Sequence, residues 1–394
     1  MSGNVNRSSK GKNTILAISV LLAFSAVVIV VLAFVLSSQL GGMLQISYEN
    51  YLLFFKFRYP LIIGSFIVCG FYVYANHKYR FFHKATSVIL VLLVIGFAAL
   101  ARFYLPIISF STFQHKAQYF PIDEAAPHID SDDRDMIVIE RNGIARAYSN
   151  RMSFLPHIAG GSFNGEDIIM AYCVLSSLPI AFKDDLGGNK MDISVLLAPA
   201  NNLLMYEHNS GEFIRQLKLR TERTEIPLQL VPVQKMPWRS FKELYPEGEV
   251  FLPVNKSFMQ KIMDKAIGGT VDSIIDNQKL FYKPMYILDP RLPETERVWG
   301  VLVDNDPIAL SSSYLKNNNM VQVQLGGRDV VIVYFNEYDT VGAFYNDTGL
   351  SFTYSEIDPH GMVGDTKLER VEGLFNTVFW GVWAYFYPHT QILK

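Results

Sequence analysis

Residues 139–185 of this chain return, without a gap, 162 positions further on as residues 301–347. Several matched positions hold identical residues, and Tyr172, for example, falls on Tyr334. An internal repeat restricts the architecture before any local pattern does, because both copies must fold into the same kind of unit. We therefore predict two related units that pack against each other through their apolar faces.

A second match follows each copy. Six residues separate Trp238 from the next Tyr-Pro pair, and the same spacing follows Trp380. The interval between the two matches is 20 residues shorter in the second copy, so the first copy is the fuller one. Trp238, Trp380 and Trp383 stand at helical spacing beside other aromatic residues, which favours buried core positions over a sugar or peptide groove.

Three apolar runs precede the repeat. Thr14–Leu36 holds 23 residues without a charge, enough to cross about 30 Å of hydrocarbon. Tyr59–Ala75 and Ala85–Tyr104 are two further candidates, and Pro106 is expected to end the last. Because no backbone polar group can stay unpaired in lipid, all three are predicted to be helices. Residues 1–106 are thus predicted to form a membrane anchor with the lipid bilayer as its partner.

Basic residues are biased towards one side of these runs. They precede the first run and lie between the second and the third, as Arg7, Lys10, Lys12, Lys78, Arg80 and Lys84. The positive-inside rule then predicts a cytoplasmic amino terminus. Three crossings would leave the rest of the chain outside the cytoplasm, so we expect an inner-membrane protein with a periplasmic or extracellular domain.

Composition excludes several classes of protein. A net charge of −2 provides no basic surface for nucleic acid. Two cysteines in 394 residues rule out a disulfide framework, and only Cys173 lies in the predicted folded region, since Cys69 belongs to an apolar run. No metal site and no cofactor are predicted.

Alternating apolar residues predict strands after the anchor. Asn142-Gly143 and Asn164-Gly165 are typical of hairpin turns, and the apolar run Ile168–Leu175 indicates a central strand. The predicted fold class is α+β, with a β-rich extracytoplasmic domain of two pseudo-repeats. The expected divisions are a linker at 107–135, a first repeat at 136–252, a helical connector at 253–296 and a second repeat at 297–394.

Four stretches of the first copy carry a family resemblance. They are ARAY at 145–148, the run starting AYC at 171, LLMYEHNSGEFIRQL at 203–217 and MPWRSFKELYPEGEVFL at 236–252. In order and spacing, residues 136–394 resemble the domain-of-unknown-function family numbered 3179. The resemblance implies an extracytoplasmic, often membrane-linked domain whose biochemical role is not established.

The chain departs from the family pattern at three places. The family's Y-C-P-L-C motif is Tyr-Cys-Val-Leu-Ser here, so Ser176 replaces the second cysteine. The histidine of its W-H-E stretch is shifted by one position to His157, and its Y-D-R stretch reads Tyr-Glu-His at 206–208. If the family's cysteine pair binds metal or cycles redox, this member is expected to have lost that chemistry.

Cys173 is the sharpest catalytic candidate. It could act as a nucleophile or as a metal ligand, with His157 or His208 as the base or the second ligand. Its apolar sequence neighbours favour an inert buried thiol instead. The predicted ligand-binding residues are Arg146, Tyr148, Tyr172, Glu207 and His208. Adjacent strand residues point to opposite faces, so Glu207 and His208 are not expected to bind one metal ion.

Three functions remain open at this point. The first is ligand binding or envelope assembly without catalysis, and no site in the sequence specifies the ligand. The second is a thiol- or metal-dependent enzyme that uses Cys173 and nearby histidines. The third is an accessory subunit of a membrane complex, with another membrane protein as its partner.

Overall fold

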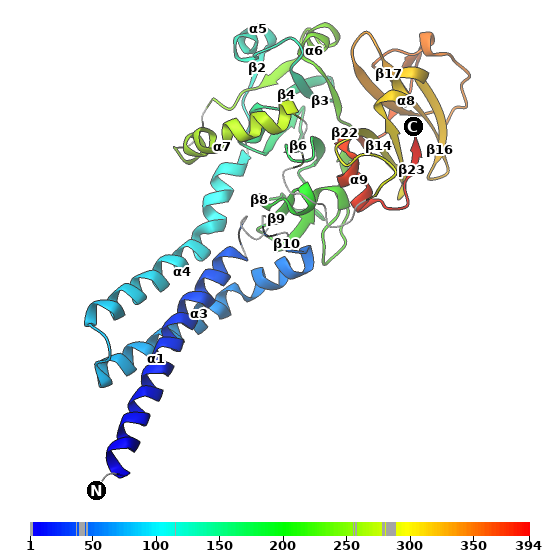
Figure 1. Cartoon of the computed structure of the whole chain (residues 1–394). Helices are drawn as coiled ribbons and strands as arrows, with labels where there is room; N and C mark the ends of the chain where they lie inside the picture. Colours follow the sequence, from blue (N-terminus) through cyan, green and yellow to red (C-terminus); the bar gives the residue numbers. More distant parts are fainter. Residues whose placement is uncertain are drawn as a thin grey trace. The chain divides into compact units, whose positions relative to one another are not determined.

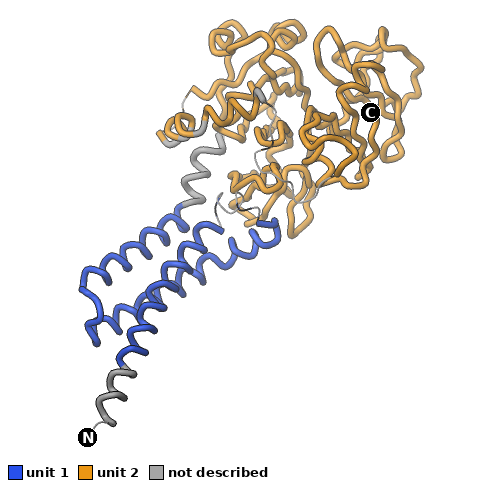
Figure 2. The backbone as a smooth tube through the Cα atoms, viewed as in Figure 1, with its two compact units in different colours: residues 1–107 blue, residues 108–394 orange. Residues whose placement is uncertain are grey.

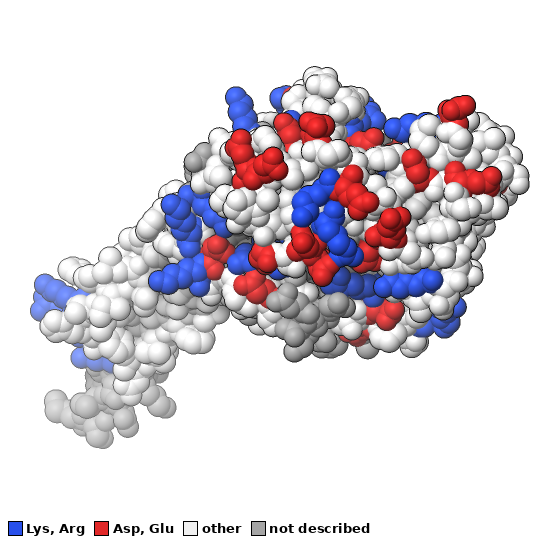
Figure 3. All heavy atoms as spheres, turned by 90° about the horizontal axis from the view of Figure 1, so that it is seen from above, with Lys and Arg blue, Asp and Glu red and all other residues white. Residues whose placement is uncertain are grey.

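The computed structural model describes residues 3–36, 38, 44, 46–114, 116–254, 256, 258–277, 280 and 289–394. The chain divides into two compact units, residues 1–107 and 108–394, which Figure 2 shows in blue and orange. The first unit is helical, and the second consists mainly of strands (Figure 1). On the face shown in Figure 3, acidic and basic side chains are interspersed over the second unit, whereas most of the first unit is uncharged.

The first unit contains the predicted apolar helices. They are α1 (Gly3–Val35), α3 (Tyr48–Tyr79) and α4 (Lys84–Thr112). Within the described residues, three spans are long and apolar enough to cross a membrane, namely Lys12–Val35, Tyr48–Tyr79 and Lys84–Phe103. Their existence and order confirm the prediction.

Two of the predicted helix boundaries were wrong. The helix α3 begins at Tyr48 rather than Tyr59, because Ser47 caps it by accepting a hydrogen bond from the Asn50 backbone N–H. Pro106 does not end α4, which continues to Thr112. Apolarity alone marks the lipid-facing part of a helix, whereas a helix can continue into a more polar environment.

Polar contacts fix how the three helices meet. Ser65 Oγ on α3 donates 2.7 Å to the Ala26 carbonyl on α1. Asn76 braces the α3–α4 turn, since its Nδ2 donates 2.9 Å to Ser87 Oγ and its Oδ1 accepts 2.8 Å from the Phe82 N–H. Many large apolar side chains of these helices are exposed, as on a surface that faces lipid.

The strands of the second unit fall into two sets, the first in residues 113–251 and the second in residues 297–393. The first set forms two five-stranded sheets. One has the order β12 (Gln234–Pro237), β3 (Asp135–Arg141), β4 (Ile144–Ser149), β13 (Glu249–Phe251), β2 (Tyr119–Pro121). The other has the order β1 (Phe113–Gln114), β5 (Ile158–Phe163), β6 (Glu166–Cys173), β7 (Leu178–Lys183), β11 (Leu230–Val231). The predicted Asn-Gly turns are confirmed, since Asn142 and Asn164 both have positive φ and join β3 to β4 and β5 to β6.

The second set, yellow to red in Figure 1, forms two four-stranded sheets. One has the order β22 (Leu374–Phe379), β14 (Arg297–Val303), β15 (Asp306–Ser311), β23 (Gln391–Leu393). The other has the order β16 (Met320–Leu325), β17 (Arg328–Phe335), β18 (Thr340–Tyr345), β21 (Glu369–Arg370). A short helix follows β12 and β22 alike, as α6 (Trp238–Leu244) and α9 (Trp380–Phe386).

The two sets share their strand order and their register. In the first set Tyr172 pairs with Pro179 and Ile139 with Arg146, and 162 positions further on Tyr334 pairs with Val341 and Val301 with Ile308. Both sets also add a last parallel strand, β13 beside β4 and β23 beside β15. This is the topology that the predicted repeat requires, and duplication of one ancestral unit remains our interpretation of it.

Other elements distinguish the two sets. The sheet β10 (Glu212–Arg215), β9 (Leu204–Glu207), β8 (Ile193–Leu197) belongs to the first set. The pair β19 (Met362–Val363) and β20 (Thr366–Lys367) and the helix α8 (Ser312–Asn318) belong to the second. The predicted connector contains the helix α7 (Phe258–Asn277), and its residues 278–279 and 281–288 lie outside the described residues.

The expected linker at 107–135 is not a simple tether. It contributes the end of α4, the strands β1 and β2 and the helix α5 (Ile122–Ala125). These strands pair with β5 and β13, whose residues are distant in the sequence. Strands of two or three residues have no local periodicity, so the sequence pattern alone predicts only a linker here.

The two sets meet along a contact that we call the seam. The strand β12 packs against β18, and its counterpart β22 packs against β7. One apolar cluster contains residues of both sets, including Cys173, Phe375, Trp380 and Trp383. Trp238 lies in a separate cluster, and all three tryptophans are buried, as predicted.

Candidate functional site

Arg146, a predicted ligand-binding residue, lies at the centre of a network around β4. Its Nε donates 2.8 Å to Glu249 on β13, and its Nη1 donates 2.7 Å to the Ser162 carbonyl on β5. Its guanidinium group lies over the rings of Tyr119 and Phe163, with its carbon 3.8 and 4.5 Å from their centroids. Only 11% of the side chain is exposed, so the position of the cation is fixed.

Tyr148, also predicted to bind a ligand, contacts the Tyr119 ring on which Arg146 packs. Its hydroxyl lies 2.8 Å from the Tyr119 hydroxyl, and the two rings pack edge to face. Gly161 provides the space for Tyr119, because a Cβ there would lie 2.3 Å from the tyrosine oxygen. The glycine is therefore required for close approach, a common role of glycine inside a strand.

Arg146 faces a cavity of about 380 Å³ whose lining carries side chains of both charges. The polar lining consists of Lys116, Tyr119, Arg146, Asp167, Asp184 and Lys190, together with residues 160–162 of β5. Lys190 pairs with Asp167 at 2.6 Å, and this hydrogen bond lowers the pKa of Asp167. The cavity can therefore accept a small polar molecule that has both an anionic and a cationic group.

Cys173, the catalytic candidate, is buried in the core shared by the two sets. Its Sγ lies 3.5 Å from the Asn201 carbonyl, and only 1% of the residue is exposed. Burial raises the pKa of its thiol. Ser176, at the position of the family's second cysteine, is also buried, and its hydroxyl has no hydrogen-bond partner. A buried thiol with a raised pKa is a poor nucleophile at neutral pH.

His157 lies just before β5, where its ring packs edge to face on Phe154. Burial lowers its pKa to about 4, so the imidazole is neutral at physiological pH. Its Nδ1 is buried without a hydrogen-bond partner. A neutral histidine could accept a proton, but the contacts of Cys173 described above do not include it.

Glu207 and His208 lie at the end of β9, and their contacts are local. The Glu207 carboxylate accepts hydrogen bonds from the backbone N–H groups of Asp192, Asn209 and Ser210. His208 Nε2 lies 2.9 Å from Ser194 Oγ. This is the geometry of a capped hairpin turn, in which the carboxylate is already occupied by donors.

The described part of the chain contains no group of three or more His, Cys, Asp or Glu side chains that could hold a metal ion. The family described as "Protein of unknown function (DUF3179)" matches residues 105–390. The chain belongs to the DUF3179 family. No curated protein and no solved structure matches it. The match begins within α4 and covers all the strands from β1 to β22, so the family unit is the strand-rich part of the chain.

In this DUF3179 member, a polar cluster at the seam escaped the sequence prediction. Lys235 on β12 is buried, and its Nζ lies 2.9 Å from Asp135, 3.2 Å from Ser177 and 2.7 Å from Thr377. Burial raises the pKa of Asp135, but the charges of Lys235 and Arg297 outweigh burial and lower this pKa below its usual value.

Tyr172, the remaining predicted ligand-binding residue, lies near this cluster. Burial and then the charge of Asp135 raise the pKa of its hydroxyl. The contact of Ser177 with a buried lysine resembles the serine-lysine arrangement of some hydrolases. Burial lowers the pKa of Lys235, however, and the charge of Asp135 opposes this shift, because the ammonium group pairs with that carboxylate at 2.9 Å and donates to Ser177 Oγ. The cluster thus joins the two sets rather than forming a nucleophile.

A larger cavity of about 740 Å³ lies between the two sets. Leucine side chains and Phe386 form part of its wall, and Arg220 lies at its edge, where Nη2 donates 3.1 Å to Asn305. No sequence motif pointed to this cavity, although a groove between paired units is a common ligand site.

Proposed function

We propose that this protein is a membrane-anchored binding protein whose strand-rich unit lies outside the cytoplasm. It holds a small zwitterionic ligand, such as an amino acid or the end of a short peptide, in the cavity beside Arg146. The ligand carboxylate faces the guanidinium group of Arg146, and its cationic group faces Asp184. No covalent step is involved.

The fixed position of Arg146 is the observation that carries this proposal. Two ring contacts, one carboxylate and one carbonyl orient the guanidinium group before any ligand arrives, which lowers the entropic cost of binding. Guanidinium groups recognise carboxylates well because their planar donors match the two oxygens. The nearby backbone of Gly160 and Gly161 allows a ligand to approach β5 closely.

The contacts of the catalytic candidates support binding over catalysis. A thiol enzyme needs a reactive thiolate beside a base, whereas burial raises the pKa of Cys173 and lowers that of His157. If the protein is an enzyme instead, purified protein should contain stoichiometric copper, zinc or iron that is lost in Cys173→Ser. If it is an accessory subunit, a partner should remain bound in mild detergent.

The test is a thermal-shift and calorimetric titration of the full chain in mild detergent. The probes are the twenty amino acids, glycylglycine and acetate. At least one zwitterion should stabilise the wild type, whereas acetate should bind much more weakly. Arg146→Gln should weaken that binding at least tenfold, since a hydrogen bond to a charged group contributes about 1.5–3 kcal/mol.

Arg220→Gln is the matched control, because it removes an arginine from the larger cavity and leaves Arg146 intact. Its affinity for the zwitterion should equal that of the wild type. Loss of binding in Arg220→Gln and not in Arg146→Gln would place the ligand in the larger cavity instead. The location is tested with a reporter that is active only outside the cytoplasm, fused after Lys394, and an inactive reporter in a folded fusion would reject it.

A further inference from the structure

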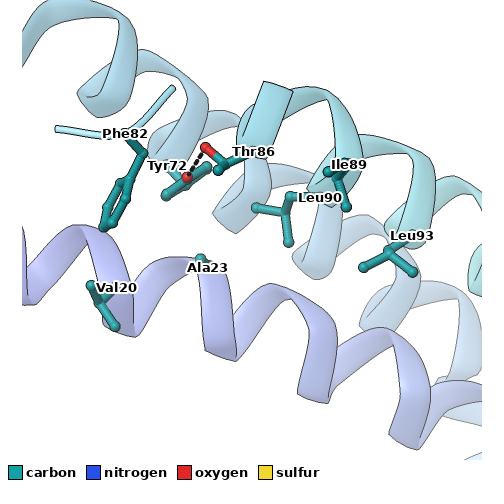
Figure 4. Close-up of a pocket in the computed structure, with 8 residues that line it drawn as sticks. All are labelled: Val20, Ala23, Tyr72, Phe82, Thr86, Ile89, Leu90 and Leu93. Carbon is teal, nitrogen blue, oxygen red and sulfur yellow. Dashed lines mark hydrogen bonds between the residues drawn. The ribbon is translucent and has the colours of Figure 1, made fainter. Parts of the chain in front are cut away.

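An apolar groove of about 390 Å³ lies between the helices of the first unit. Figure 4 shows its lining, with Val20 and Ala23 on α1, Phe82 in the α3–α4 turn and Thr86 near the start of α4. The remaining lining residues are Tyr72, Ile89, Leu90 and Leu93. Along α4 the groove extends from residue 86 to residue 93, roughly 10 Å at the helical rise.

The groove is open on one side. Val20, Ile89 and Leu93 line it and keep 50%, 56% and 45% of their surface exposed. Within a helix that spans a membrane, such exposed apolar side chains contact lipid chains. Its one polar pair, the Tyr72 hydroxyl and Thr86 Oγ1, is satisfied internally at 3.2 Å. The groove therefore suits a hydrocarbon chain rather than a polar ligand.

Basic side chains surround the end of the groove at the α3–α4 turn. Lys78, Arg80 and Lys84 are all exposed there, within a few residues of Phe82 and Thr86. Aromatic residues accompany them, since Lys78 Nζ lies 5.8 and 5.4 Å from the ring centroids of Tyr74 and Tyr79. Exposed tyrosines beside lysines are typical of the level of the lipid head groups.

These cations have almost no acidic partner within their own unit. Residues 1–107 contain nine lysines and arginines against one acidic residue, Glu49. Residues 108–394 contain 26 basic and 36 acidic residues, so the cationic excess is confined to the helical unit. Glu49 lies at the start of α3, and the turn is at the end of that helix. The positive charge at the α3–α4 turn is therefore expected to attract an anion from the surroundings.

We propose that this groove is a binding site for one anionic phospholipid. One acyl chain lies along α4 between Thr86 and Leu93, and the phosphate of the head group lies among Lys78, Arg80 and Lys84. The site fixes the packing of α1 against the α3–α4 hairpin, because the chain contacts Val20 and Ala23. This inference does not depend on the ligand proposed for the strand-rich unit.

The test is native mass spectrometry of the full chain in mild detergent, titrated with phosphatidylglycerol or phosphatidylcholine of identical acyl chains. The wild type should bind one phosphatidylglycerol at least tenfold more tightly than phosphatidylcholine. The triple variant K78Q/R80Q/K84Q should lose about 100-fold in affinity for phosphatidylglycerol, since each basic residue near an anionic lipid contributes roughly fivefold. The three substituted residues are exposed, so the variant should still fold, and a melting curve checks this.

Two further variants separate the head group from the chain. The control K56Q/R58Q/R102Q removes three other cations of the same unit and should keep the wild-type affinity within threefold. Ala23→Phe fills the groove and should weaken both lipids. Equal losses in the two triple variants would mean diffuse attraction and overturn the site. So would displacement of phosphatidylglycerol by glycerol 3-phosphate at equal concentration, because the groove would then contribute nothing.

Discussion

Lys235 Nζ donates a hydrogen bond of 2.7 Å to Thr377 Oγ1, and the two residues hold equivalent places, three positions before Trp238 and Trp380. A second equivalent pair accompanies them, since Asp135 and Arg297 lie 162 positions apart and approach to 4.0 Å. Identical charges at equivalent places would face each other across such a seam and repel. The two sets differ at these places, and the difference makes the seam complementary.

Lys235→Met tests this contact. The variant leaves Asp135 without its closest cation, so the free energy of unfolding should fall by about 2–3 kcal/mol, below the value for a fully buried pair because Asp135 is 36% exposed. Chemical denaturation monitored by tryptophan fluorescence measures the change. The double variant D135N/K235M should recover part of the loss, and a single variant as stable as the wild type would show that the contact contributes nothing.

Cys173 should be inert in the folded protein. Burial raises the pKa of its thiol and excludes reagents, so labelling should follow the rate of unfolding. The measurement is the reaction with a thiol reagent in a Cys69→Ala background, with and without urea. Rapid stoichiometric labelling at neutral pH without urea would instead favour the thiol enzyme.

Local signals in the sequence predicted much of this fold. The turns Asn142-Gly143 and Asn164-Gly165 depend on positive φ, which is a local preference. The apolar run of β6 marks a central strand because both its faces are buried. The strands β1 and β2 were missed, since pairing with β5 and β13 holds them in place and their own residues do not specify it.

The candidate site was predicted only in part. Arg146 and Tyr148 were predicted from the sequence, whereas Tyr119, which contacts both of them, was not. The Gly160-Gly161 pair inside β5 was the available signal, because glycine in a strand often marks the close approach of another group. Lys235 could not be found this way, since a lysine in a strand usually points to solvent.

His157 predicts a specific loss of stability in acid. Burial lowers its pKa to about 4 in the folded state, below the usual 6.5. Between pH 6.5 and 4 the unfolded chain therefore binds a proton that the folded chain does not, so stability is full above pH 6.5 and falls as the pH drops towards 4. Melting temperatures measured across this range should fall more steeply for the wild type than for His157→Gln.

The pKa values of Glu140 and Glu166 lie below that of His157, so these two carboxylates lose their stabilising contribution at lower pH. A hydrogen bond with His360 helps to hold the pKa of Glu140 at about 2, and one with Arg141 does the same for Glu166. Their stabilising contribution is lost between about pH 4.5 and 2. Parallel slopes in the wild type and His157→Gln would contradict a buried neutral imidazole.

Gly161→Ala should disturb the Arg146 site through Tyr119. The new Cβ would lie 2.3 Å from the Tyr119 oxygen, so the ring must move and its 2.8 Å contact with Tyr148 should break. Overpacking of this kind costs about 1–3 kcal/mol, and binding of the zwitterion should weaken as the ring leaves the guanidinium group. Gly269→Ala is the control, because a Cβ there has nothing within 4 Å and alanine has a higher helix propensity than glycine in α7. Denaturant unfolding should show a loss for the first variant and none for the second. Equal stability of both variants would mean that Tyr119 is free to move, and the preformed site would then lose its physical basis.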